Sequence, residues 1–243
     1  MVVKSKRRIS LRLIFGIALF AAGFITAIYP FVMSNFKAVQ MNQEISAFEQ
    51  YVEQVKESNN SSEKDLLNSL YNELTEYNKS LINNGQEISC SDDFEEFGVD
   101  IAKYGFEDNI IGVIDIPKLD QKLPLYLGAS KKNMADGATV LGSTSAPIGG
   151  VSTNCVIAGH RGSVTGTKFR YINELEPGDK VYIENPWETL AYEVVSTVVS
   201  DPADVSQIVI RRNKDMITLF SCHPYPQNYQ RYFVFCERVT ESK

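Results

Sequence analysis

Histidine and cysteine are scarce in this sequence, and their spacing excludes most metal chemistry. The chain of 243 residues contains two histidines and four cysteines. The cysteines, Cys90, Cys155, Cys222 and Cys236, form no C-x-x-C pair, and neither histidine stands at zinc-binding spacing from them. Four thiols in a chain of this length also do not make a disulfide framework. We therefore expect neither a resident metal or cofactor nor a fold held together by disulfides.

A surplus of basic residues is missing as well. The chain has 30 acidic and 24 basic residues, which gives a formal net charge of −6. A general nucleic-acid-binding protein needs a basic face, so this composition argues against that class. Because 44% of the residues are hydrophobic and 22% are charged, the chain has enough apolar surface for one core, with appendages.

The basic residues that do cluster lie at the N-terminus, ahead of a long uncharged run. Residues 1–12 contain five lysines and arginines, and residues 13–33 are 21 consecutive residues without a charge. A run of this length can span a bilayer. With the positive flank retained in the cytoplasm, the rest of the chain lies outside the cell. We expect a cytoplasmic tail (1–12), a single transmembrane anchor (13–33) in the cell membrane, and an extracellular domain.

A cleaved signal peptide is the alternative for this N-terminal region. The stretch LFAAGFITA contains small residues that a signal peptidase accepts. The apolar part of a signal peptide is usually shorter than 21 residues, which favours a retained anchor. Both alternatives export the domain.

Helix-forming residues dominate the next segment, 34–84. Ala47, Tyr51 and Val55 are spaced by four, and a second apolar stripe begins at Leu66. Between them, the stretch SNNSSEKDLL indicates a helix break followed by an N-cap at Ser61 or Ser62. The pattern predicts two helices that form a stalk and lift or brace the domain above the membrane.

From residue 110 the pattern changes to that of β-strands. Short runs rich in Val, Ile and Tyr alternate with Gly, Pro, Asn and Asp: IIGVIDI, LPLYLG, NCVIAGH, DKVYIEN, LAYEVVSTVVS, DMITLFSC and RYFVFCERV. We predict a mainly β fold, a closed barrel of seven to eight strands over residues 106–240. It is preceded by the N-terminal helices and the transmembrane helix. The intervening segment, 85–105, is polar and acidic in its first part and is predicted to be a loop.

A cysteine stands at the end of one of these apolar runs. Cys222 follows TLFS, and Pro224 and Pro226 come next, where proline cannot donate a ladder hydrogen bond. Regular pairing therefore stops near Cys222. After the prolines the β pattern resumes, so Arg231 opens the next strand and can lie beside Cys222. A thiol next to a fixed cation is a plausible nucleophile.

A histidine follows another buried run and supplies the missing base. His160 comes after the apolar run 155–158 and Gly159, and is the first polar side chain beyond that strand. Imidazole can take the proton of Cys222 and later give it to a leaving amine. Arg231 stays charged and can hold an oxyanion or a substrate carbonyl. His223 is the other candidate base, but it directly follows Cys222, so on a strand its side chain points to the opposite face.

These residues resemble the signature of the sortase family. TLFSC is followed by an arginine nine positions later, and GHRG lies on an earlier strand. Ser221 replaces the usual threonine of the signature. The resemblance extends over residues 110–239, and LPLYLGAS, INELEPGDKVYIEN and YNKSLINN are similar to the class C, pilin-polymerising branch.

The resemblance implies a membrane-anchored bacterial cysteine transpeptidase. Such an enzyme cuts an LPxTG-like sorting signal between Thr and Gly and holds the acyl group on Cys222 as a thioester. In class C the resolving amine is a pilin lysine, whereas in anchoring sortases it belongs to a cell-wall precursor. Two other possibilities stay open: an exported cysteine peptidase that hydrolyses its thioester, and a non-catalytic adhesion domain tethered to the membrane.

The class C resemblance also implies a lid over the active site. The sequence DDF, Asp92 to Phe94, stands where that class has Asp-Pro-Phe or Asp-Pro-Trp. Asp93 replaces the proline, which removes its fixed φ angle. Asp92, Asp93 and Phe94 are therefore candidate lid residues, and a solvated acidic linker is the alternative.

Overall fold

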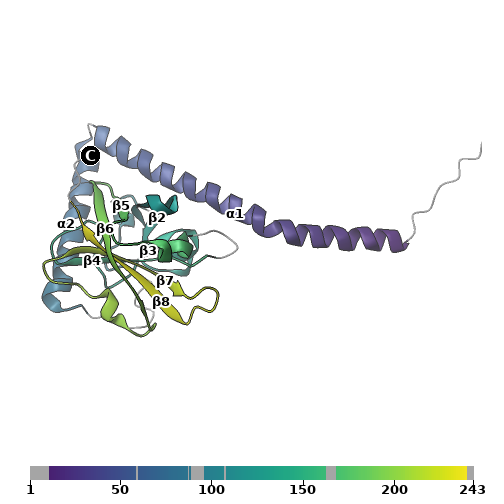
Figure 1. Ribbon diagram of the computed structural model, residues 1–243. Helices are drawn as coiled ribbons and strands as arrows, with labels where there is room; N and C mark the ends of the chain where they lie inside the picture. The colour runs from purple at the N-terminus through teal and green to yellow at the C-terminus, as the bar shows by residue number, and fades with distance from the viewer. Residues whose placement is uncertain are drawn as a thin grey trace, which may run out of the picture.

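Two long helices precede a closed β-barrel in the computed structural model of the chain (Figure 1). The structure describes residues 11–58, 60–86, 88, 96–106, 108–162 and 168–239. Helix α1 spans Leu11–Glu57 and helix α2 spans Ser61–Asn84. The two helices meet at one end of α1, and α2 then runs back along the barrel.

Eight strands close the barrel in the order β1-β2-β3-β4-β7-β8-β6-β5. Pairing is parallel between β2 and β3 and between β4 and β7, and antiparallel between the other neighbours. The strands are β1 (Ile110–Ile116), β2 (Gln121–Leu127), β3 (Ala138–Val140), β4 (Thr153–Ala158), β5 (Lys180–Glu184), β6 (Thr189–Ser200), β7 (Asp215–His223) and β8 (Gln230–Arg238). The predicted barrel is confirmed, and β3 is the strand that was not among the seven apolar runs.

Short helices precede the first strand or connect later ones. A six-residue α-helix lies between β2 and β3, and 3-10 turns lie elsewhere on the barrel surface. They are η2 (Ala102–Tyr104), η3 (Pro117–Leu119), α3 (Lys131–Asp136), η4 (Lys168–Glu174) and η5 (Val205–Ile208).

The strands bury side chains on both faces. Alternate residues of β7 and β8, among them Leu219 and Val234, belong to the main core. The residues between them, among them Phe220 and Phe233, belong to a second apolar cluster on the other face, together with Ile208 of η5. The connection between β6 and β7 therefore covers the outer face of the strands that carry the predicted site.

The predicted stalk helices pack against the barrel. Ile45, Phe48, Val52 and Val55 of α1 are buried, as are Leu67, Leu70 and Leu74 of α2. Tyr126 donates a hydrogen bond to Glu44 (2.6 Å), and the side-chain oxygen of Asn78, which is buried, accepts one from the amide of Ala146 (2.7 Å). The second half of α1 and all of α2 are thus part of the globular unit.

The N-cap of α2 differs from the predicted one. Asn60 caps this helix, because its side-chain oxygen accepts a hydrogen bond from the amide of Ser62 (3.1 Å). We expected Ser61 or Ser62 at that position. Asn and Ser are about equally good caps, so the sequence pattern could not choose between adjacent residues.

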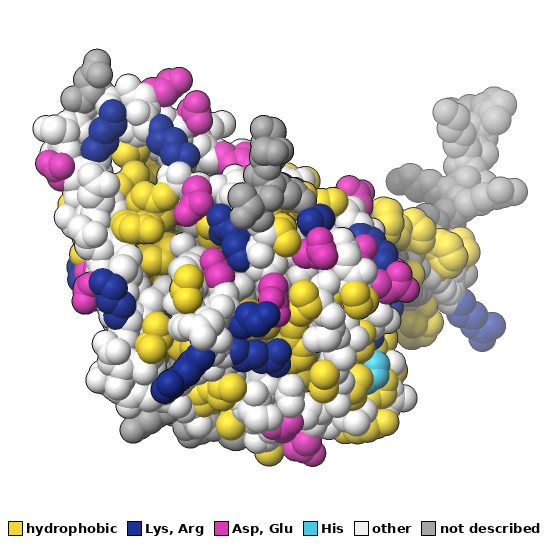
Figure 2. Space-filling view, turned by 60° about the vertical axis from the view of Figure 1, so that its left-hand side comes forward, with side chains coloured by type: hydrophobic (Ala, Val, Ile, Leu, Met, Phe, Trp, Pro, Cys, Tyr) yellow, Lys and Arg dark blue, Asp and Glu magenta, His cyan; other side chains and the backbone are white. Residues whose placement is uncertain are grey.

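The first half of α1 extends beyond the barrel and is apolar on all sides. Phe15, Phe20, Phe24 and Phe31 are each more than half exposed, and Figure 2 shows hydrophobic side chains on this receding part of the helix. Helix α1 has the length and apolar composition needed to cross a membrane.

The packing of α2 can be tested with two leucines of one helix. Leu70 is fully buried, whereas Leu66 is 43% exposed. We expect Leu70→Ala to lower the free energy of unfolding by about 2–5 kcal/mol, since it leaves a cavity between α2 and the barrel. Leu66→Ala serves as the matched control and should change it by less than about 1 kcal/mol. Equal effects in denaturant titrations would show that α2 does not pack as described.

Candidate active site

Parallel pairing of β4 with β7 brings the segment that carries His160 to the end of β7 that carries Cys222. Ala158 pairs with Phe220, and the amide of Gly159 donates to the carbonyl of Phe220 (3.2 Å). Continued by two residues, this register aligns His160 with Cys222. Because side chains alternate along a strand, Cys222 lies on the face of Phe220, and a continued register would place His160 on the same face.

Antiparallel pairing of β7 with β8 sets Arg231 beside Cys222 from the other side. The two residues are directly opposite in the register, so their side chains share a face. The guanidinium of Arg231 donates to the carbonyls of Gln230 (3.0 Å) and Asn228 (3.3 Å) and is partly exposed. The predicted adjacency of Cys222 and Arg231 is therefore present.

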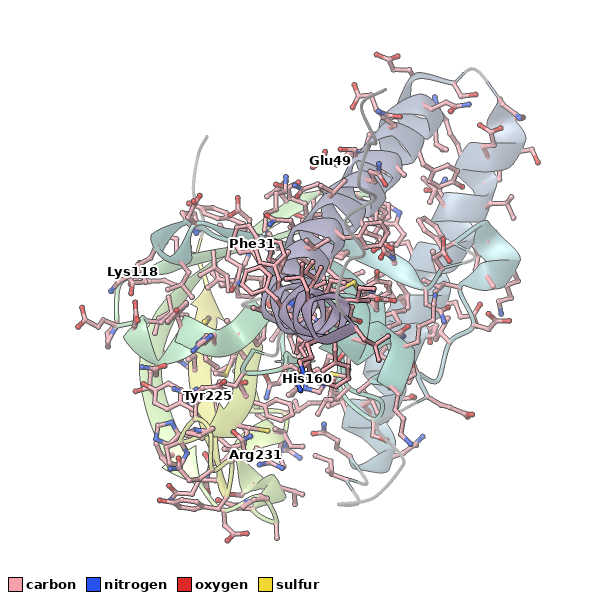
Figure 3. All side chains as sticks on the ribbon, turned by 90° about the vertical axis from the view of Figure 1, so that its right-hand side faces the viewer. Phe31, Glu49, Lys118, His160, Tyr225 and Arg231 are labelled. Atoms are coloured by element: carbon pink, nitrogen blue, oxygen red, sulfur yellow. The ribbon has the colours of Figure 1, made fainter. Side chains whose placement is uncertain are left out.

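Cys222 and Arg231 lie at the end of the barrel where β7 turns into β8. Figure 3 labels His160 and Arg231. A cavity of about 300 Å³ opens beside Arg231 on the same face. Its walls come from the residue after β3, from the β6–β7 connection, and from β7 and β8: Leu141, Pro202, Asp204, Val205, Ile208, Phe220, Arg231 and Phe233. Most of these side chains are apolar, so the cavity suits a short apolar peptide segment.

The surroundings of His160 favour its neutral form. Neighbouring protein atoms limit the hydration of the ring, and the cation of Lys168 repels a proton, so both lower the pKa of His160 below its usual 6.5. Lys168 is buried and donates to the carbonyls of Met134 (2.7 Å) and Ala135 (2.5 Å) in α3. Burial lowers the pKa of Lys168 to about 8. At neutral pH Lys168 is mostly charged and His160 is mostly neutral, the form that accepts a proton.

Arg161 was not singled out from the sequence, although it lies inside the GHRG motif. It is 9% exposed, and one guanidinium nitrogen donates to the carbonyl of Cys222 (3.1 Å) and lies 2.6 Å from Nδ1 of His223. The other terminal nitrogen donates to the side-chain oxygen of Asn173 (2.6 Å). Arg161 thus ties the segment that carries His160 to the backbone of Cys222.

His223 is engaged on the opposite side of the strand end. Desolvation and then the nearby cation of Arg161 lower the pKa of His223. Its ring also lies 5.5 Å from the ring of Tyr232. Contact with Arg161 and Tyr232 agrees with the expectation that His223 points away from the face of Cys222.

The other described cysteines are core residues. Cys155 and Cys236 are 3% and 0% exposed, and desolvation raises the pKa of both thiols. Cys222 is partly exposed. Within the described ranges, no group of three His, Cys, Asp or Glu side chains is arranged to hold a metal ion. The candidate lid residues Asp92, Asp93 and Phe94, and also Cys90, lie outside the described residues.

The electrostatic influence of Lys168 on His160 can be measured directly. Removal of the cation in Lys168→Gln, which keeps a hydrogen-bond donor, should raise the pKa of His160 in an NMR titration. The acid limb of any reaction that needs neutral His160 should move to higher pH with it. Lys131→Gln, which removes an exposed lysine of α3, should leave the titration unchanged. A pKa of His160 that stays constant or falls in Lys168→Gln would contradict this coupling.

Comparisons with known proteins agree on one family. The model of the sortase domain matches residues 114–239, just over half of the chain. Sortase D of Bacillus subtilis is 29% identical over 132 residues, which cover 53% of this chain and 64% of that protein. Sortase A of Bacillus anthracis is 32% identical over 125 residues, 51% of this chain and 58% of that protein. The chain thus spans about three-fifths of the length of these curated relatives.

Solved structures extend the similarity beyond the barrel to the helices. Sortase C of Streptococcus pneumoniae is 28% identical with a TM-score of 0.66, and the match covers 83% of this chain and 98% of that one. Sortase C1 of Streptococcus agalactiae is 28% identical with a TM-score of 0.71, and the match covers 82% of this chain and 99% of that one. Sortase C of Clostridium perfringens SM101 is 29% identical with a TM-score of 0.62, and the match covers 81% of this chain and 100% of that one. The chain therefore belongs to the sortase family, and its fold is similar to those of the class C members.

Proposed function

We propose that this protein is a membrane-anchored cysteine transpeptidase that acts through Cys222. The observation that carries the proposal is the pairing of both edges of β7. On one edge Arg231 is opposite Cys222, and on the other the segment that carries His160 follows directly after the paired residues of β4. This set contains a nucleophile, a base and a fixed cation, which is sufficient for acyl transfer.

The first half-reaction forms a thioester. His160 takes the proton of the Cys222 thiol, and the sulfur attacks the carbonyl carbon of Thr in an LPxTG-like signal. Arg231 stabilises the negative charge that develops on the carbonyl oxygen. The Thr–Gly bond then breaks, and His160 gives its proton to the leaving amine of Gly.

The second half-reaction transfers the acyl group to an amine. The neutral amine attacks the thioester carbon, a C–N bond forms and the C–S bond breaks. His160 accepts the proton that the amine loses, and Cys222 returns to its initial state once it is reprotonated. Water in place of the amine gives hydrolysis, which would make the protein a peptidase.

The cavity beside Arg231 is the site we assign to the sorting signal. Leu141, Val205, Ile208 and Phe220 give it apolar walls, which suit the Leu and Pro side chains of such a signal. Arg231 lies at the end of this cavity nearest the thiol, because it pairs with Cys222. A peptide in the cavity would thus present its next residues to the sulfur.

We infer that the acyl acceptor is a lysine of a pilin subunit. Support comes from similar proteins. The structure of sortase C from Streptococcus pneumoniae is described as giving insight into pilin substrate specificity, and a sortase C from Group B Streptococcus is described as pilus-related. Transfer to a cell-wall precursor, as in anchoring sortases, is the alternative. Helix α1 would hold the enzyme in the cell membrane through residues 13–33, with the barrel outside the cell.

Transpeptidation can be tested with an LPxTG-like peptide and an added lysine-containing peptide. We expect an amide-linked product, which mass spectrometry detects, and its loss in Cys222→Ala and His160→Ala. His223→Ala is the matched control for the second histidine and should keep product formation within about tenfold of the parent. A product formed by Cys222→Ala would refute the proposal, and hydrolysis alone with every amine tried would favour the peptidase.

Arg231 should contribute through its planar fork as well as through its charge. We expect Arg231→Lys to lower kcat/KM by about tenfold or more, as loss of one transition-state contact of about 1.4 kcal/mol predicts. Arg238→Lys changes the last residue of β8, at the other end of the same strand, and should have little effect on catalysis. Near-normal turnover in Arg231→Lys would assign Arg231 a structural role.

A further inference from the structure

Three exposed tyrosines and an arginine lie in the segments at the end of the barrel that carries Cys222. Tyr171, Tyr225 and Tyr229 are 44%, 46% and 64% exposed. The guanidinium of Arg170 lies 4.8 Å from the ring centre of Tyr225 and 5.8 Å from that of Tyr171. These four residues come from η4 and the β7–β8 connection, and we call them the tyrosine face. The acyl-transfer chemistry described above makes no use of them.

Helix α1 passes the same end of the barrel on its way to the apolar segment. In Figure 1, α1 runs beyond the end at which β7 and β8 are joined. Near this end, Lys37 of α1 forms an ion pair with Asp136 at the end of α3 (2.7 Å). Carbonyls of the same short helix accept hydrogen bonds from Lys168, the first residue of η4. A continuous set of contacts therefore joins α1 to the turn that carries Arg170 and Tyr171.

The spacing along α1 places this contact at the membrane surface. Lys37 is four residues beyond Met33, the last residue of the expected transmembrane segment, which is about 6 Å along a helix. The headgroup layer on each side of a bilayer is about 5–8 Å thick. If residues 13–33 span the hydrocarbon core, Lys37 lies in the headgroup layer, and Asp136 is bonded to it.

We propose that the tyrosine face docks on the bilayer that α1 enters, with phospholipid headgroups as its partner. The proposal rests on the membrane anchoring by α1 proposed above. Tyrosine and arginine suit this position, because each has an apolar body and a polar end, and such side chains are enriched at membrane interfaces. The mouth with His160 and Cys222 then faces the membrane surface, and substrates reach it along that surface.

The opposite end of the barrel offers a natural reference. Trp187, the only tryptophan of the chain, lies in the turn before β6, whereas Ser200 at the other end of β6 pairs with Arg231. The ring of Trp187 packs on the ring of Tyr71 in α2, and the two ring centres are 5.2 Å apart. The side of the molecule that carries α2, at the left in Figure 1, faces the viewer in Figure 2, which shows charged side chains of both signs on it. Trp187 is thus directed away from the proposed membrane contact.

The test uses the full chain in vesicles of phosphatidylcholine with a minority of phosphatidylglycerol. One protein carries Tyr229→Trp together with Trp187→Phe, and the other is the parent, with Trp187 alone. Trp187→Phe should be tolerated, because the indole nitrogen is buried without a hydrogen-bond partner. Lipids brominated near the top of the acyl chain should reduce the emission of the introduced tryptophan at least about twofold and leave that of Trp187 nearly unchanged. Tyr225→Trp in the same background should give the same result.

The other outcomes overturn the proposal in distinguishable ways. If the protein floats with the vesicles but the tryptophans at 225 and 229 are not quenched, anchoring stands and docking fails. If the protein does not float with them, both anchoring and docking fail, and the amide-forming assay in detergent still reports on the catalytic proposal. Equal quenching of Trp187 would show that the barrel has no preferred face. An emission change that follows protein concentration in lipid-free detergent would assign the face to a second copy of the chain.

Discussion

Hydrogen-bonded pairing on both edges of β7 is the constraint on which the site depends. The antiparallel pairing with β8 places Arg231 opposite Cys222, and the parallel pairing with β4, continued past Gly159, would align His160 with Cys222. A shift of either register by one residue would move the partner side chain to the other face. The apolar residues of both faces oppose such a shift, since it would expose Leu219 or Phe233 in place of burying them.

Two buried cations tune this arrangement. Desolvation of the ring and then the cation of Lys168, which is held by carbonyls of α3, lower the pKa of His160, so the base is mostly neutral at neutral pH. Arg161 donates a hydrogen bond to the carbonyl of Cys222 and contacts the ring of His223. This contact holds His223 on the face of β7 opposite to that of Cys222. Both cations follow β4 in the chain, as His160 does, and Arg161 bonds to the backbone of the residue that carries the thiol.

The sequence predicted the features that depend on local pattern. Apolar runs and their breakers identified seven of the eight strands, and the strand-end positions of His160, Cys222 and Arg231 followed from them. Strand β3 has three residues, Ala138–Val140, which is too short for any periodicity to be visible. The amphipathic stripes of the two helices predicted that each has a buried side, but not that the barrel is what covers it.

The influence of Arg161 and Lys168 could not be predicted from the sequence in the same way. Charged residues in polar segments are usually solvated, and only the tertiary structure shows that these two are buried. Arg161 acts through a backbone carbonyl 61 residues away, and Lys168 through carbonyls of α3 more than 30 residues away. Such contacts depend on how the barrel closes, which no single segment encodes.

The central claim is that the acyl group passes through the sulfur of Cys222. Intact-protein mass spectrometry after brief mixing with a sorting peptide, without an added amine, tests it most directly. The account predicts a mass increase equal to the peptide portion up to Thr, located on Cys222 by fragmentation and removed by hydroxylamine. Peptide cleavage with no such adduct under rapid quenching, or an adduct on another residue, would contradict it.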